Sequence, residues 1–138
     1  MKKEQSVLAI LSQLTQLQEL NLSNNQLKVI PTEIGQLEKL TKLHLDDNEL
    51  TEIPKEIAQL WNLQELSLSK NKITELPKEI GQLANLTTLD VAANKLATIP
   101  TEISYAAKLI SLNLNDNPLG KAEINKLKFL LPELKITF

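Results

Sequence analysis

The stretch LQELSLSKNKITELPKEIG, residues 63–81, decides the fold, because close copies of it recur along the chain. Its asparagine, Asn71, belongs to a column in which asparagine returns every 23 positions, and a proline column and a leucine column keep the same step. The columns are Asn25, Asn48, Asn71, Asn94 and Asn117; Pro31, Pro54, Pro77 and Pro100; and Leu20, Leu43, Leu66, Leu89 and Leu112. Three columns in phase at one period indicate a repeat protein.

Each unit predicts a short strand followed by a short helical segment. The alternation of Leu66 and Leu68 with polar residues has the period of a strand. Pro77 with Glu79 two residues later is typical of the first turn of an α-helix or 3₁₀-helix. One unit cannot bury its own apolar side chains, so the units are expected to stack and share a continuous core.

With this motif the sequence resembles the leucine-rich repeat family. The 23-residue unit is similar to the class typified by plant intracellular Ras-group-related proteins, and to free-standing repeat proteins of bacteria, spirochaetes among them. The resemblance covers residues 14–119. It implies an α/β fold, namely a right-handed solenoid with a parallel β-sheet on the concave side and short helical or 3₁₀ segments on the convex side. It also implies action by binding, without naming a ligand.

We predict a single domain over residues 1–138. Its parts are an N-terminal helical cap over residues 1–13, about five 23-residue repeats over residues 14–119, and a C-terminal cap over residues 120–138. The C-terminal cap is expected to hold a helix over residues 121–131, which Pro132 ends, and a final edge strand over residues 134–138. Because both ends are then closed, we expect the chain to be complete.

Composition argues against several classes of function. The chain has 15 Lys and Arg against 17 Asp and Glu. This balance argues against a broad electrostatic grip on nucleic acid, which needs a basic stripe, and removes the usual attraction to an anionic membrane. The absence of cysteine excludes disulfides, thiolate nucleophiles and cysteine-based zinc sites. No stretch is long enough for a signal peptide or for membrane insertion. These features favour the cytoplasm, while secretion remains open if a signal was removed.

The asparagine column is predicted to be structural. A short amide side chain that points inward can both donate and accept hydrogen bonds, and so satisfy backbone groups at the turn after each strand. Bonds between neighbouring units would then form a ladder along the solenoid. We therefore assign Asn25, Asn48, Asn71, Asn94 and Asn117 to stability rather than to binding.

The candidate binding surface is the concave face. Side chains between the leucines of each strand point away from the core, and in-register strands place them in columns. The candidate partner-binding residues are Glu19, Asn21, Lys42, His44, Asp46, Glu65, Ser67, Asp90 and Asn113. The column Glu19–Lys42–Glu65 alternates in charge and predicts a ladder of ion pairs. The alternative is a solvated face, whose pairs contribute only about 0–1 kcal/mol each, and the face lacks the aromatic and Arg residues typical of binding hot spots.

His44 is the single histidine of the chain. Together with Asp46, Asp47 and Glu65 it could form at most a weak, oxygen-rich cluster. One histidine provides no metal-ligand spacing, and no nucleophile stands in a recognisable triad. We therefore predict no metal site, no cofactor and no catalytic residue, and interpret His44 as a contact or surface residue.

Trp61 is the single tryptophan. The equivalent positions of the other units carry Thr15, Glu38, Ala84 and Ala107, and these small or polar residues predict that Trp61 is exposed. An exposed tryptophan can anchor a partner on the flank of the solenoid. The alternative is that its ring packs over neighbouring helical turns.

The sequence favours a non-catalytic module, expected as a monomer, that binds a protein or peptide on the concave face. The alternative is a structural, self-associating or regulatory scaffold that uses the Trp61 flank. An enzyme finds no support, because there is no cysteine nucleophile, no phosphate-binding glycine loop and no paired acid and base.

Overall fold

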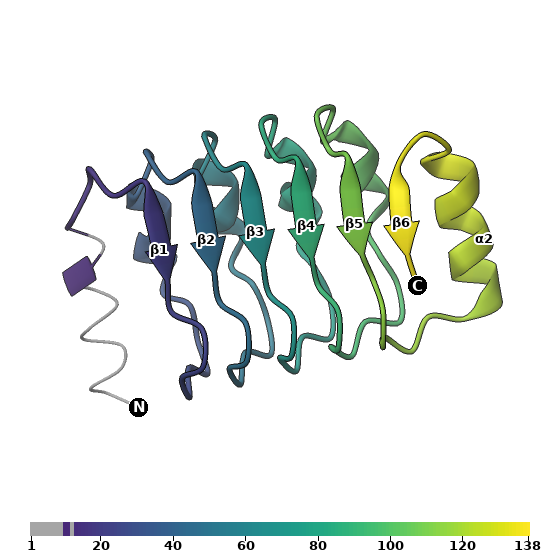
Figure 1. Cartoon of the computed structure of the whole chain (residues 1–138), viewed down its shortest axis with the longest axis horizontal. Helices are drawn as coiled ribbons and strands as arrows, with labels where there is room; N and C mark the ends of the chain where they lie inside the picture. The colour runs from purple at the N-terminus through teal and green to yellow at the C-terminus, as the bar shows by residue number, and fades with distance from the viewer. Residues whose placement is uncertain (1–9, 12) are drawn as a thin grey trace.

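The computed structural model describes residues 10–11 and 13–138, and within them a parallel sheet runs in chain order from β1 to β6. The strands are β1 (Glu19–Asn21), β2 (Lys42–His44), β3 (Glu65–Ser67), β4 (Thr88–Asp90), β5 (Ser111–Asn113) and β6 (Lys135–Thr137). The helical segments are η1 (Thr32–Gln36), η2 (Lys55–Gln59), η3 (Lys78–Gln82), η4 (Thr101–Tyr105) and α2 (Lys121–Leu130). The strands form one layer and the helical segments of the repeats lie behind it (Figure 1). This confirms the predicted α/β repeat solenoid.

The strands pair so that each residue meets its equivalent in the next unit. Leu20 pairs with Leu43 and Leu43 with Leu66, and the same register continues to β5. The 23-residue period of the sequence is therefore the distance along the chain from one strand to the next. As a result, the residue type at one position of the motif decides the character of a whole column on the sheet.

The core is aliphatic and continuous along the solenoid. The middle leucine of β2, β3, β4 and β5 is at most 1% exposed. Ile57 and Ile80 from the helical segments are fully buried against this row. The residues on either side of each middle leucine are half-buried or exposed, so the alternation in the sequence separates the core from the outer face of the sheet.

The helical segments of the repeats are 3₁₀-helices of five residues. A proline stands at each N-cap in an extended conformation, as Pro77 does with φ −67°. Proline suits this place because its φ is fixed and its missing N–H would have no partner there. Each segment closes with a bond from a leucine or alanine amide to the carbonyl three residues before, for example Leu60 to Ile57. The tight 3₁₀ geometry suits such short runs.

The structure describes the C-terminal end of the solenoid fully but only a few residues of the predicted N-terminal cap. At the C-terminus, α2 buries Leu127 against the core, and β6 pairs with β5 through Lys135 and Ser111 at the edge of the sheet. The helical cap predicted over residues 1–13 lies outside the described residues, except for Ile10, Leu11 and Gln13. Leu11 packs against the first part of the core, whereas Ile10 is exposed.

Candidate functional site

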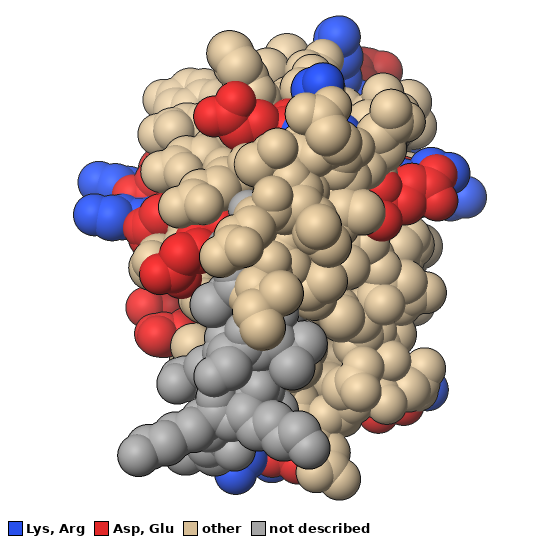
Figure 2. Space-filling view, turned by 90° about the vertical axis from the view of Figure 1, so that its left-hand side faces the viewer, with Lys and Arg blue, Asp and Glu red and all other residues tan. Residues whose placement is uncertain are grey.

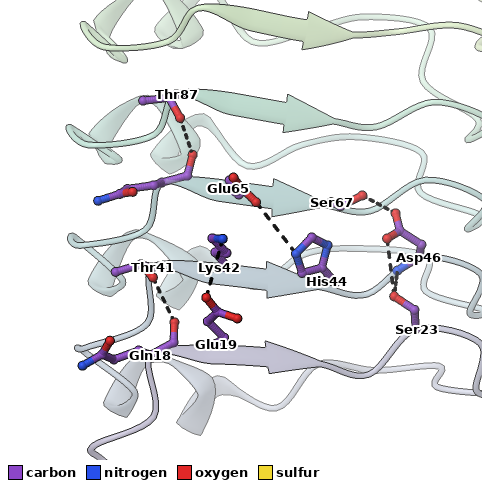
Figure 3. Close-up of polar contacts among 11 residues, drawn as sticks. Gln18, Glu19, Ser23, Thr41, Lys42, His44, Asp46, Glu65, Ser67 and Thr87 are labelled. Atoms are coloured by element: carbon purple, nitrogen blue, oxygen red, sulfur yellow. Dashed lines mark hydrogen bonds and ion pairs between the residues drawn. The ribbon is translucent and has the colours of Figure 1, made fainter.

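The in-register strands bring the predicted binding residues onto one face. One outward column runs Glu19, Lys42, Glu65, Thr88, Ser111 and Lys135, and the next runs Asn21, His44, Ser67, Asp90, Asn113 and Thr137. Asp46 follows β2 at the exit of the strands, two residues beyond His44, and its side chain lies beside the second column (Figure 3). All nine candidate residues therefore share the outer side of the sheet, which we call the concave face.

The charged column forms one link of the predicted ladder. Lys42 Nζ lies 3.5 Å from Glu19 Oε1. Among the described residues, however, Glu65 does not pair with Lys42; its Oε2 lies 4.0 Å from His44 Nε2 instead (Figure 3). His44 points from β2 toward β3, so Glu65 on β3 lies diagonally across from it rather than directly opposite. Both pairs are partly exposed, and pairs of this kind contribute little to stability.

Asp46 is held by three serines at the exit of the strands. Its carboxylate accepts hydrogen bonds from the Ser69 amide and hydroxyl, both at 2.8 Å, and from the hydroxyls of Ser67 and Ser23. Burial alone raises the pKa of Asp46, but the hydrogen bonds from Ser67 and Ser69 outweigh burial, so the pKa lies below its usual value. Asp46 was predicted as a contact residue, and the structure shows that most of its acceptor capacity is used within the chain.

Because of these bonds, Asp46→Asn is expected to remove an acid-sensitive part of the stability. The folded-state pKa lies below that of the unfolded chain, so the unfolded state binds more protons between the two values. The stabilisation is therefore complete above the unfolded-state value of about 3.9 and is lost as the pH falls through the folded-state pKa. Urea unfolding between about pH 6 and about pH 3 should show the wild type losing more stability than the variant.

Asp47→Asn is the matched control for this measurement. Asp47 is exposed next to Asp46, and among the described residues its carboxylate accepts no hydrogen bond from a serine. The control should follow the wild type. If Asp46→Asn and the wild type lose stability in parallel, the serine cluster has no role in acid sensitivity.

A shallow hollow of about 310 Å³ lies in the middle of the concave face. Its polar lining consists of His44, Glu65, Ser67, Thr88, Asp90, Ser111 and Asn113. Within it, Asp90 Oδ1 accepts the Ala92 amide at 3.0 Å, and Asn113 Oδ1 accepts the Thr137 hydroxyl at 2.9 Å. The lining thus presents donors and acceptors from four adjacent strands, β2 to β5. Within the described part of the chain, no group of three or more His, Asp or Glu is placed to hold a metal ion.

The asparagine column lies on the inner side of the turns, away from the hollow. Asn71 Nδ2 donates to the Leu45 and Leu68 carbonyls at 3.0 Å, and its Oδ1 accepts the Leu50 amide at 3.0 Å. The Leu68 carbonyl also accepts Asn94 Nδ2 at 2.9 Å, so the bonds continue from unit to unit. Asn48 and Asn117 make the equivalent bonds.

Asn25 differs from the rest of its column. It is exposed, and among the described residues its side chain bonds only to the Leu22 and Ser23 carbonyls of its own turn. Asn48, Asn71 and Asn94 are by contrast at most 8% exposed. The five positions are therefore not equivalent, although the motif is the same in each.

Trp61 lies on the flank and not on the concave face. Its side chain is 59% exposed, as the equivalent positions predicted. Its carbonyl accepts Asn85 Nδ2 at 2.6 Å, which fixes its backbone to the next unit. Tyr105 at the end of η4 is 73% exposed. Both aromatic side chains are therefore accessible from solvent.

The charges of the molecule are mixed. Seen from its N-terminal end, acidic and basic side chains lie next to one another rather than in separate patches (Figure 2). The end of the molecule seen in this view thus offers no extended field of one sign to steer a strongly charged partner. Of the helices in the described residues, none is long and apolar enough to cross a membrane.

Comparison with known families agrees with this geometry. The sequence matches the family described as leucine rich repeat over residues 38–96 and 61–119, and the one described as leucine rich repeats in two copies over residues 15–58. The chain belongs to the leucine-rich repeat family. Members of this family generally act as non-catalytic modules for protein interaction, and the family predicted from the motif is confirmed.

Solved structures of bacterial leucine-rich repeat proteins resemble this chain. One from Leptospira interrogans is 40% identical, with a TM-score of 0.78 over 93% of this chain and 38% of its own. Internalin C2 of Listeria monocytogenes is 30% identical, with a TM-score of 0.79 over 95% of this chain and 55% of its own. An internalin InlF from the same species, 23% identical with a TM-score of 0.77 over 93% of this chain and 36% of its own, shares the fold.

This leucine-rich repeat protein thus spans between about a third and just over half of the length of these solved structures. None of the curated proteins matches it. The similarity therefore covers the repeat solenoid, and the partner has to be sought from the surface of the chain itself.

Proposed function

We propose that this leucine-rich repeat protein is a non-catalytic binding module that recognises a partner protein or peptide on its concave face. The observation that carries the proposal is the hollow formed by β2 to β5, where side chains from successive units converge. Glu65 and Asp90 would provide carboxylates and His44 an imidazole, and the serines and Asn113 would provide neutral donors and acceptors. Such a lining suits a polar segment of a partner better than an apolar one.

The size of the face limits the partner surface that it can cover. The six strands of the sheet lie about 4.8 Å apart, so the outward columns extend about 25 Å from the first strand to the last. This length suits a peptide segment or a small epitope. Because the face carries no large aromatic anchor, we expect binding to depend on several polar contacts together rather than on one dominant residue.

The double variant Lys42→Ala/His44→Ala is expected to lose the partner. Both residues lie on the concave face and neither is fully buried, so the change removes two contacts without opening the core. Affinity capture from lysates should retain a protein on the wild type and retain at most about a tenth as much on the variant, which corresponds to about 1.4 kcal/mol. Asp46 is left unchanged because its loss would disturb the serine cluster.

The matched control is Lys55→Ala/Lys78→Ala. These two exposed lysines begin η2 and η3 on the opposite side of the sheet. The control should retain the same protein as the wild type. If the control loses the partner and the concave variant keeps it, the site lies outside the concave face; loss on Trp61→Ala alone would support the scaffold that uses the Trp61 flank.

A further inference from the structure

A second polar depression lies at the edge of the sheet where the strands begin. It has a volume of about 390 Å³ and is separate from the hollow on the concave face. Its lining consists of Gln18, Lys39, Thr41, Asn62, Gln64 and Asn85. We call it the amide trough, because four of these six residues carry side-chain amides. Figure 3 shows Gln18 and Thr41 on the side of the sheet where the strands start.

The trough is held together mainly by bonds to backbone atoms. The Thr41 hydroxyl donates to the Gln18 carbonyl at 3.1 Å. Asn62 Nδ2 donates to the Glu38 carbonyl at 2.8 Å, and Asn85 Nδ2 donates to the Trp61 carbonyl at 2.6 Å. These bonds fix the side chains of Asn62 and Asn85 relative to the units before them. The rim of the trough is therefore preorganised.

Some of the amide capacity of the trough remains available. Among the described residues, the side chain of Gln64 makes no hydrogen bond, and Asn62 uses only its Nδ2 group. Gln64 is exposed. A glutamine amide has two donor hydrogens and an acceptor oxygen. Gln64 and Asn62 Oδ1 can thus bind a ligand that presents both donors and acceptors.

An exposed aromatic residue belongs to the same turn. Trp61 directly precedes Asn62, its carbonyl is bonded to Asn85, and its side chain is 59% exposed. An indole ring offers an apolar face that can cover the C–H face of a sugar ring. The equivalent positions of the next two units hold Ala84 and Ala107, so neither unit offers an aromatic side chain there.

From these features we propose that the amide trough binds a neutral oligosaccharide. The amides of Asn62 and Gln64 hydrogen-bond its hydroxyls, and the Trp61 indole packs against one sugar ring. The lining contains no apolar pocket for a peptide side chain, which disfavours a peptide. Lys39, its one charged group, is bonded to Gln16 Oε1 at 2.6 Å, which disfavours an anion. A hydroxyl-rich neutral ligand uses the groups that are present.

The test is binding of the whole chain to a printed array of neutral oligosaccharides, anionic oligosaccharides and short peptides. A neutral oligosaccharide bound on the array is then titrated into the protein in solution. Trp61→Ala and Gln64→Ala should each weaken its binding by about tenfold or more, while Trp61→Phe should keep part of it. All these side chains are exposed, so the variants should fold as the wild type does.

Two matched controls remove the same chemical groups elsewhere. Gln82→Ala changes an exposed glutamine at the end of η3, and Tyr105→Ala changes an exposed aromatic at the end of η4; both should bind as the wild type does. The proposal is overturned if no neutral oligosaccharide binds, if the trough variants bind as tightly as the controls, or if anionic sugars or peptides are preferred. The capture experiment on the concave face is independent of each of these results.

Discussion

Asn71→Ala is expected to lower the free energy of unfolding by about 1–3 kcal/mol. The change removes the acceptor of the buried Leu50 amide and the donor to the Leu45 and Leu68 carbonyls. These backbone groups lie in the interior, where an unpaired polar group loses its hydration without compensation. Chemical denaturation of the wild type and the variant, monitored by circular dichroism, measures the difference.

Asn25→Ala is the control for this prediction. Asn25 occupies the same position of the motif but is exposed, so water can replace its side-chain bonds. Its loss should cost clearly less, below about 1 kcal/mol. Equal losses for Asn25→Ala and Asn71→Ala would show that the inter-unit bonds do not contribute to stability in the way the geometry indicates.

Gly81→Ala is expected to destabilise the solenoid by about 1–3 kcal/mol. A Cβ on Gly81 would overlap the backbone carbonyl of Glu102 in the next unit. Because that carbonyl belongs to the first turn of η4, the overlap can be relieved only by moving η3 and η4 apart. The same denaturation experiment measures the loss.

Gly35→Ala is the control for this prediction. It distinguishes the effect of a backbone overlap at Gly81 from the general cost of replacing a glycine. A Cβ on Gly35 would meet first the end of the flexible Gln59 side chain, with the nearest backbone atom, the Glu56 oxygen, at 3.0 Å. Most of this overlap can be relieved by rotating a side chain, so the loss should be smaller than at Gly81. A loss at Gly35 as large as that at Gly81 would contradict the role given to the Glu102 carbonyl.

The sequence predicted the fold because the repeat transfers one local pattern to every unit. Once Leu43 and Leu66 are assigned to the core, the period places Lys42 beside Glu19, and the ion pair between them follows. The same argument predicted the buried side chains of Asn48, Asn71 and Asn94 and the exposure of Trp61. It was wrong for Asn25, which is exposed because no earlier repeat of the same kind covers it. Within the inner repeats, each of these features depends on the position in the motif.

Features that depend on individual side-chain conformations could not be predicted in this way. The period places Glu65 beside Lys42, but which side chain it meets depends on rotamers, and the structure places it closest to His44. The capture of Asp46 by serines arises from Ser23, Ser67 and Ser69, which occur together only around this unit.

The backbone conformation of the turns after the strands could not be predicted from the motif either. Asn24, Asp47, Lys70, Ala93 and Asp116 all have positive φ, between 55° and 60°. Asparagine and aspartate are typical of this left-handed conformation, but lysine and alanine are not. At Lys70 and Ala93 the stacked repeat imposes the conformation on residues that do not favour it by themselves.

The most direct test of recognition on the concave face is photo-crosslinking of the captured partner. A photoreactive p-benzoylphenylalanine replaces Thr88, which is exposed on β4 and lines the hollow, or Lys78, which is exposed at the start of η3. Recognition by the concave face predicts a covalent adduct from position 88 and none from position 78. An adduct from position 78 without one from position 88 would contradict it.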